Sequence, residues 1–222
     1  MPIANNSILK EEFDWAFRFK LPEKNPSRVL LLLHGWTGDE RSMWQFTQNI
    51  PSDYAIIAPR APYDTPLDKK GYSWREIKAN TWGAPTLAEL RFAADGLITL
   101  VDKWLVSVKI APASLDVVGF SQGGALATTL ASLHPERMRK VAILSGFIPA
   151  GGEALLSPNL LDDIHFFWAH GSEDDVISLE RGLASVALLK DSGADLRLCK
   201  AKIGHRVSRE CRYALNDFLN AA

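Results

Sequence analysis

The chain has 222 residues and a formal net charge of −1, with hydrophobic residues making up 47% of the sequence and charged residues 23%. These values are typical of a soluble globular protein, and we expect a single compact domain over residues 1–222. Lysines and arginines are scattered rather than clustered, so nothing in the charge favours binding to nucleic acid or to an anionic membrane.

Signals for targeting and for an oxidising compartment are absent from the sequence. The first ten residues lack the basic start and apolar stretch of a secretory signal. The longest apolar run, Val29–Leu33, is too short to cross a bilayer. Cys199 and Cys211 are too few for a disulfide framework, so we expect both to fill space in the core. A cytoplasmic protein without integral membrane contact is the resulting prediction.

The first expected strand comes from an aromatic alternation. Between Phe13 and Phe19, aromatic residues alternate with charged or small ones, and this period of two predicts a half-buried strand near a sheet edge. Residues 29–34 form a continuous apolar run that stops at Gly35. Such a run is typical of a strand that is buried on both faces.

Apolar runs and segments of helical spacing then alternate along the chain. Further strands are expected at 54–58, 115–120, 141–145, 164–170 and 195–200. Helices are expected at 86–108, 122–134, 179–190 and 207–219. The alternation predicts an α/β fold with a mostly parallel sheet covered by helices on both faces. In such sheets, ligands bind at the carboxyl ends of the strands.

Residues 60–85 show neither the alternation of a strand nor the apolar spacing of a helix, and they contain Trp74 and Trp82. A loop this long in a compact domain is often a functional cover. It can equally be a surface excursion that two buried tryptophans hold in place. We therefore expect either a cover over the substrate site or a plain surface loop.

The strongest local motif is Gly-Phe-Ser-Gln-Gly at residues 119–123. A chain of this length contains the pattern G-x-S-x-G by chance roughly once in a dozen cases. Here, however, it lies between an expected strand and a helix of small residues, as in a nucleophile turn. Glycines on either side of the serine remove side chains that would collide in this sharp turn. We expect Ser121 to be a nucleophile.

A serine nucleophile needs a base, and the base needs an orienting acid. In the α/β-hydrolase order the nucleophile comes first, then the acid, then the histidine. Of the five histidines, only His205 follows the last expected strand, and we expect it to be the base. The loop after residues 164–170 supplies the acid, but spacing alone does not separate Asp174 from Asp175.

The oxyanion of acyl transfer needs two backbone N–H donors. Gln122, directly after the nucleophile, supplies one. The second is expected from the loop after residues 29–34, where Gly35 lets the backbone turn inward and Trp36 is the candidate donor. His34, in the same turn, is expected to be a structural hydrogen-bonding residue.

Together these stretches resemble the phospholipase/carboxylesterase family, which includes bacterial carboxylesterases and acyl-protein thioesterases. The matching stretches are LLHGWTGD (32–39), APRAP (58–62), GYSWRE (71–76), GFSQGG (119–124), LSGFIP (144–149), HGSEDDV (170–176) and GH (204–205). They follow the order of the family and cover most of the chain.

The resemblance implies that Asp174 is the acid, because the H-G-x-x-D pattern of the family places it there. The sequence departs from the family at Asp175, where a proline is common, and at Ser178, where the family often has a second proline. Candidate walls of an apolar acyl pocket, any of which could be plain core, are Trp74, Trp82, Phe147, Ile148 and Ile177.

The predicted function is a serine esterase of the carboxylesterase, lysophospholipase or acyl-thioesterase type. It would hydrolyse a small-molecule ester or thioester through an acyl-enzyme, with no metal or organic cofactor, as a monomer or a homodimer. The alternative is a ligand-binding α/β-hydrolase scaffold with little turnover. The complete set of nucleophile, base, acid and oxyanion turn favours the enzyme.

Overall fold

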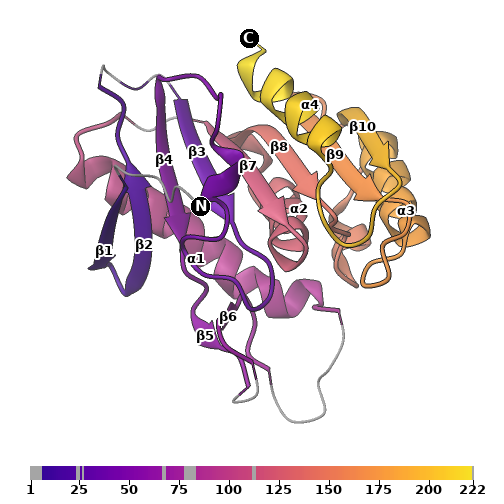
Figure 1. Ribbon diagram of the computed structural model, residues 1–222, viewed down its shortest axis with the longest axis horizontal. Coiled ribbons are helices and arrows are strands. Elements are labelled where there is room, and N and C mark those ends of the chain that lie inside the picture. Colours follow the sequence, from indigo (N-terminus) through magenta and orange to yellow (C-terminus); the bar gives the residue numbers. More distant parts are fainter. Residues whose placement is uncertain are drawn as a thin grey trace.

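The computed structural model describes residues 7–23, 26, 28–66, 69–77, 84–111 and 114–221. Its centre is an eight-stranded sheet in the order β1-β2-β4-β3-β7-β8-β9-β10 (Figure 1). The strands are β1 (Ile8–Glu12), β2 (Trp15–Lys20), β3 (Arg28–Leu33), β4 (Tyr54–Pro59), β7 (Leu115–Phe120), β8 (Met138–Leu144), β9 (His165–Gly171) and β10 (Asp195–Ala201). From β4 to β10 neighbouring strands are parallel, whereas β2 runs antiparallel to both β1 and β4.

Helices cover both faces of this sheet, which has the α/β-hydrolase architecture that the alternation of elements predicts. The helices are α1 (Leu87–Ser107), α2 (Gln122–Leu133), α3 (Leu179–Asp191) and α4 (Arg209–Asn220). Buried residues of α1, α2 and α3 share one core with Val29, Leu31 and Leu33 of β3. Buried residues of α4 share the opposite core with Leu30 and Leu32. The apolar run of β3 is continuous because both of its faces are buried.

The N-terminal edge of the sheet differs from the prediction in one respect. The alternating aromatic residues form β2 from Trp15 onward, but Phe13 lies outside it. Phe13 and Asp14 form the turn between β1 and β2, with positive φ angles of 57° and 65°. The sheet edge is β1, whose side chains are exposed except for one of intermediate exposure, so that it carries no apolar alternation to predict it.

The prediction of two separate core cysteines is wrong. Cys199 on β10 and Cys211 on α4 form a disulfide, with their Cα atoms 5.8 Å apart. The pairing follows from topology, because α4 packs back across β10 after a short loop and brings the second cysteine over the first. The prediction of a cytoplasmic location rests in part on unpaired cysteines, and the disulfide removes that argument.

The segment 60–85 has local structure of its own. Two short strands, β5 (Tyr63–Asp64) and β6 (Tyr72–Ser73), pair as an antiparallel hairpin. Tyr72 also bridges to Gly38 in the loop after β3, and Trp74 is fully buried. Trp82 lies outside the described residues. The hairpin is thus fastened to the loop that follows β3, at the carboxyl end of the sheet. No helix within the described ranges is long and apolar enough to cross a membrane.

Candidate active site

Ser121 occupies the turn between β7 and α2, at the middle of the sheet. Its backbone has φ 53° and ψ −114°, a strained conformation for a residue other than glycine. The turn is held by backbone hydrogen bonds from the Ser121 N–H to the Leu144 carbonyl (2.9 Å) and from the Ala125 N–H to the Ser121 carbonyl (3.0 Å). Strand β8 and helix α2 therefore fix this serine from two sides.

Close backbone packing explains the glycine after the serine in this turn. A Cβ atom at Gly123 would lie 2.2 Å from the Leu33 carbonyl oxygen. Any larger residue would push the start of α2 away from β3. Since α2 positions Ser121 and β3 leads into the Trp36 loop, Gly123 sets the distance between these two parts of the site.

Side chains from three loops meet at the carboxyl ends of β7, β9 and β10. His205 Nε2 lies 2.9 Å from Ser121 Oγ, and His205 Nδ1 lies 2.8 Å from Asp174 Oδ2. The Phe120 ring packs against the imidazole, with 5.0 Å between ring centroids. The three residues expected to be nucleophile, base and acid are thus joined by two hydrogen bonds, although 84 positions separate Ser121 from His205.

The surroundings of the two neighbouring aspartates differ sharply. Asp174 has a side chain with no exposed surface, and its Oδ1 accepts hydrogen bonds from the N–H groups of Val176 (3.0 Å) and Ile177 (2.8 Å). Asp175 is exposed. The two backbone donors stabilise a carboxylate at Asp174 and leave Oδ2 facing the imidazole. The structure therefore separates two carboxylates that spacing could not.

His170 lies close to Asp174 but is held by other partners. Its Nε2 lies 2.9 Å from the Ile177 carbonyl, and its Nδ1 accepts a hydrogen bond from the Trp168 indole at 3.2 Å. His170 thus supports the loop that carries Asp174, and its Nε2 lies 3.7 Å from Asp174 Oδ2, farther than His205 Nδ1 at 2.8 Å.

His34 has a structural role in the loop after β3. Its Nδ1 donates to the Gly35 carbonyl (2.7 Å), and its Nε2 accepts from the Ala61 N–H (3.0 Å). Burial lowers the pKa of His34 to about 4. A neutral, doubly hydrogen-bonded imidazole ties the Trp36 loop to the start of the segment 60–85.

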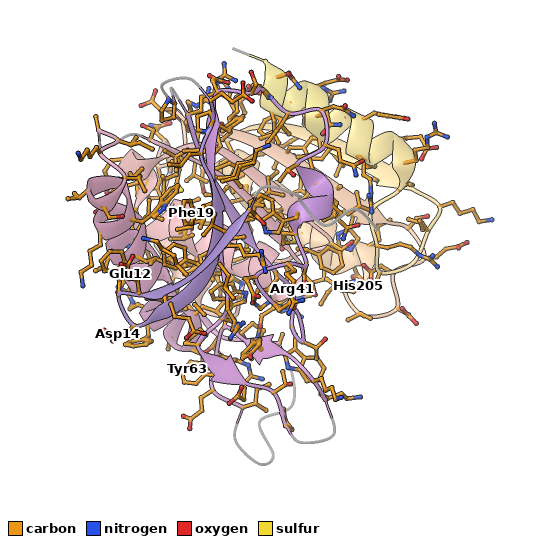
Figure 2. All side chains as sticks on the ribbon, turned by 60° about the vertical axis from the view of Figure 1, so that its left-hand side comes forward. Glu12, Asp14, Phe19, Arg41, Tyr63 and His205 are labelled. Carbon is orange, nitrogen blue, oxygen red and sulfur yellow. A yellow bond between two sulfur atoms is a disulfide. The ribbon has the colours of Figure 1, made fainter. Side chains whose placement is uncertain are left out.

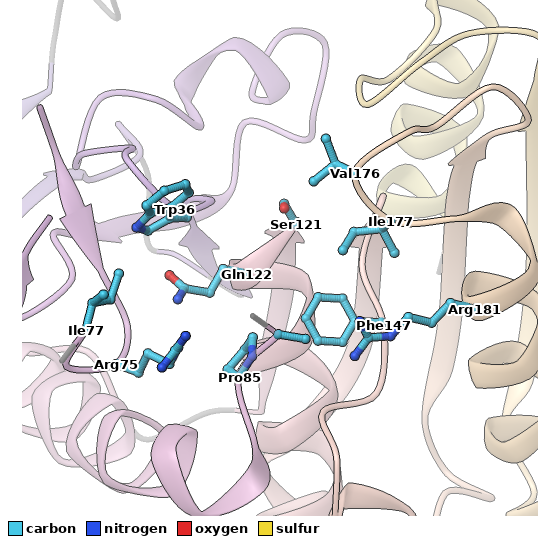
Figure 3. Close-up of a pocket in the computed structure, with 11 residues that line it drawn as sticks. Trp36, Arg75, Ile77, Pro85, Ser121, Gln122, Phe147, Val176, Ile177 and Arg181 are labelled. Carbon is cyan, nitrogen blue, oxygen red and sulfur yellow. The ribbon is translucent and has the colours of Figure 1, made fainter. Parts of the chain in front are cut away.

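The two candidate oxyanion donors lie at the cavity beside Ser121. Trp36 and Gln122 line the same cavity as Ser121 (Figure 3). Gln122 opens α2, where an N–H has no carbonyl from an earlier helical turn to bind. Its side chain is held in place, since Oε1 accepts from the Trp74 N–H (3.0 Å) and Nε2 donates to Ser73 Oγ (3.1 Å). The β5–β6 hairpin is therefore tied to the turn that carries Ser121.

The cavity beside Ser121 has a volume of about 260 Å³. Two of the five expected pocket residues, Phe147 and Ile177, line it. Trp74 does not, because it is fully buried in the core and its indole N–H donates to the His34 carbonyl at 2.7 Å. Ile148 packs against the core and is not part of the cavity wall.

Sequence reasoning missed several residues of the cavity wall, among them two arginines. The additional lining residues are Arg75, Ile77, Ala84, Pro85, Val176 and Arg181. A single arginine in a loop or on a helix reads as a solvated side chain, and only the tertiary structure shows that these two line the cavity beside Ser121 (Figure 3). No cluster of three or more histidine, cysteine, aspartate or glutamate side chains suited to a metal occurs within the described ranges.

The fold and the position of Ser121 define an α/β-hydrolase, with a serine at the sharp turn between a central strand and a helix. Within that class, the sequence profile of the phospholipase/carboxylesterase family matches residues 17–222. The chain belongs to this family.

Individual relatives carry names that describe ester or thioester hydrolysis. A protein of Oryza sativa subsp. japonica, named a probable carboxylesterase, is 32% identical over 57% of this chain, and the match spans only 48% of that relative. Acyl-protein thioesterase 1 of Mycosarcoma maydis is 30% identical over 75% of this chain and 77% of its own length. A second rice protein, named a probable inactive carboxylesterase, is 28% identical over 86% of this chain and 82% of its own.

Solved structures share the fold over nearly the whole chain. The carboxylesterase from Mesorhizobium loti superposes with a TM-score of 0.81 and 20% sequence identity. The comparison covers 98% of this chain and all of that one. At this level of identity the similarity describes the fold of the chain.

Proposed function

We propose that this protein is a serine esterase that hydrolyses carboxylic esters or thioesters, with Ser121 as nucleophile, His205 as base and Asp174 as orienting acid. The observation that carries the proposal is the pair of hydrogen bonds, 2.9 Å and 2.8 Å, that connects the three side chains beside a cavity. Membership of the phospholipase/carboxylesterase family supports the same reaction class.

The reaction would proceed through an acyl-enzyme. His205 Nε2 takes the proton of Ser121 Oγ as the oxygen attacks the ester carbonyl, and the resulting oxyanion is held by the N–H groups of Trp36 and Gln122. His205 then gives the proton to the leaving alcohol or thiol. A water molecule repeats the sequence on the acyl group, which releases the acid and restores the serine. Asp174 keeps Nδ1 protonated and stabilises the imidazolium.

The size of the cavity supports a short acyl group. Its volume of about 260 Å³ lies just below the range of roughly 300–1,000 Å³ that is common for ligand pockets. We therefore propose small esters or thioesters as substrates, and the names of the relatives are compatible with either leaving group. All the residues invoked come from one chain, so a monomer or a homodimer could carry the reaction.

The decisive experiment compares the wild type with Ser121→Ala on short p-nitrophenyl esters and on a fluorophosphonate probe. We expect the variant to lose at least about 1,000-fold in kcat, because the nucleophile is removed. The probe should label the wild type and not the variant, while both proteins unfold at similar temperatures. Full turnover or labelling in the variant would reject the assignment of the nucleophile.

A second candidate is a ligand-binding protein with little turnover. The relative named a probable inactive carboxylesterase motivates it. The same probe separates the two functions, since a serine that His205 does not activate should not react with a fluorophosphonate. An unlabelled, folded wild type that still binds esters would favour the second function.

A further inference from the structure

The cavity beside Ser121 contains a guanidinium group without an anionic partner in the part of the chain that the structure describes. Arg181, in the first turn of α3, stacks on Phe147 with its guanidinium carbon 4.0 Å from the ring centroid (Figure 3). Burial lowers the pKa of this guanidinium. A cation in the first turn also opposes the helix dipole. A bound anion would relieve both penalties.

Among the described residues that line the cavity, no carboxylate balances the charge of Arg181. Arg75 also lines the cavity and is only 5% exposed, but its Nη1 lies 2.7 Å from Glu89 Oε1. Glu89 therefore balances Arg75. The remaining wall is mainly apolar, with Ile77 and Ile177 among its members. An anion in such a cavity would be drawn to Arg181.

The position of the cavity relative to His205 indicates which part of the substrate enters it. The leaving group must lie within reach of His205 Nε2, which donates a proton to it. His205 is not among the described residues that line the cavity, whereas Trp36 and Gln122, the proposed oxyanion donors, are. The cavity therefore extends away from the leaving group and receives the acyl chain.

We propose that Arg181 binds a carboxylate at the far end of the acyl chain, so that the preferred substrates are monoesters or monothioesters of short dicarboxylic acids. The inference rests on the proposed function. A carboxylate is planar and can accept two parallel hydrogen bonds from a guanidinium. A lysophospholipid would instead place its phosphate in the leaving group, outside this cavity.

The kinetic test compares mono-4-nitrophenyl glutarate with 4-nitrophenyl pentanoate, which have the same chain but differ in the terminal carboxylate. We expect the wild type to prefer the glutarate. Arg181→Gln should lower the ratio of the two kcat/KM values by about 10- to 100-fold, because a charged hydrogen bond is lost, and mainly through KM. Arg181→Lys should retain part of the preference. The ratio is internal to each variant, so a partly unfolded sample does not distort it.

The matched control is Arg209→Gln on α4, an exposed arginine that contacts Tyr213 and does not line the cavity. Arg209→Gln should leave the ratio of the two kcat/KM values unchanged, because a distant surface charge does not contact the carboxylate of the substrate. Equal loss of the ratio in Arg209→Gln and Arg181→Gln would overturn the proposal, as would a wild type that prefers the pentanoate.

A binding test separates this inference from the proposed reaction. Calorimetry on Ser121→Ala should show monomethyl glutarate binding at least about tenfold more tightly than methyl pentanoate, and also more tightly than inorganic phosphate. The difference between the two esters should disappear when Arg181→Gln is added. Such binding without turnover in the wild type would retain the Arg181 site and reject the esterase. Hydrolysis of both esters with no effect of Arg181→Gln would retain the esterase and reject the site, and tighter binding of phosphate would reject the carboxylate.

Discussion

Asp174 and Asp175 are identical side chains at adjacent positions, and their surroundings alone distinguish them. Buried Asp174 is fixed by two backbone N–H groups, whereas Asp175 is exposed. We expect Asp174→Asn to lower kcat by about 10⁴-fold, because an amide no longer holds the imidazole in the tautomer that can accept the serine proton.

The matched control for this prediction is Asp175→Asn, which should change kcat less than about twofold, since surface substitutions away from the site are nearly neutral. Steady-state kinetics on one p-nitrophenyl ester measures both variants. Comparable losses of kcat in the two variants would show that the conformation of the loop, rather than the Asp174–His205 hydrogen bond, determines the rate.

His34 makes folding stability depend on pH. Burial lowers its pKa to about 4 in the folded protein, whereas the unfolded chain binds the proton near pH 6.5. The stabilisation is therefore complete above pH 6.5 and is lost as the pH falls toward 4, by about 3 kcal/mol in total.

Urea unfolding of the wild type and His34→Gln between pH 4 and 7.5 measures this contribution. Glutamine can donate and accept hydrogen bonds but does not titrate. We expect the variant to be less stable at pH 7.5 and to lose less free energy of unfolding on acidification. Parallel pH curves for the two proteins would place the acid sensitivity on other groups, such as Glu89, where the effect of burial on the pKa is outweighed by the hydrogen bonds from Thr86 and the charge of Arg75, so that the pKa is lowered.

Among the elements, α4 is joined to the sheet by a covalent bond as well as by packing. The Cys199–Cys211 disulfide closes the loop that carries His205, with a sequence separation of 12. A loop of this length contributes roughly 3 kcal/mol in the chain-entropy account. For a protein of this size, that corresponds to a decrease in Tm of about 6–12 °C on reduction.

Differential scanning calorimetry with and without a reductant tests the disulfide prediction. The control is the double variant Cys199→Ala/Cys211→Ala, which should melt near the reduced wild type and show no effect of the reductant. Equal Tm values for the oxidised and reduced wild type would mean that packing of α4 alone holds this edge of the sheet.

The elements that sequence could predict are those whose burial leaves a pattern. Strand β3 is buried on both faces and reads as a continuous apolar run, and the glycines around Ser121 mark its turn. The strand β1 leaves no such pattern, since its side chains face mainly solvent. The disulfide could not be predicted, because the sequence does not show that α4 packs against β10 and brings the two cysteines together. The role of Arg181 in the cavity wall could not be predicted, because it depends on packing against Phe147, which lies in a distant part of the sequence.

At the scale of the whole molecule, the order of the strands separates the site from one edge of the sheet. Ser121, Asp174 and His205 follow β7, β9 and β10, whereas β1 forms the opposite edge beyond β2, β4 and β3. Figure 2 turns this edge toward the viewer, with Glu12 at the end of β1 and Asp14 in the β1–β2 turn on the left, and His205 on the right. The profile match begins at residue 17 and therefore does not include β1.

Deletion of residues 1–12 should consequently leave kcat/KM within about twofold of the wild type, because residues 7–12, the described part of this segment, bury no side chain and do not line the cavity beside Ser121. It would instead uncover the backbone N–H and C=O groups of β2, an edge that can pair with a second chain. We expect sedimentation velocity to show concentration-dependent association of the truncated protein. A chain that begins at Ser7 retains β1 and should not associate more than the wild type. A truncated protein that is monomeric but inactive would contradict this prediction. It would show that β1 affects the arrangement of Ser121, Asp174 and His205 although it lies at the opposite edge of the sheet.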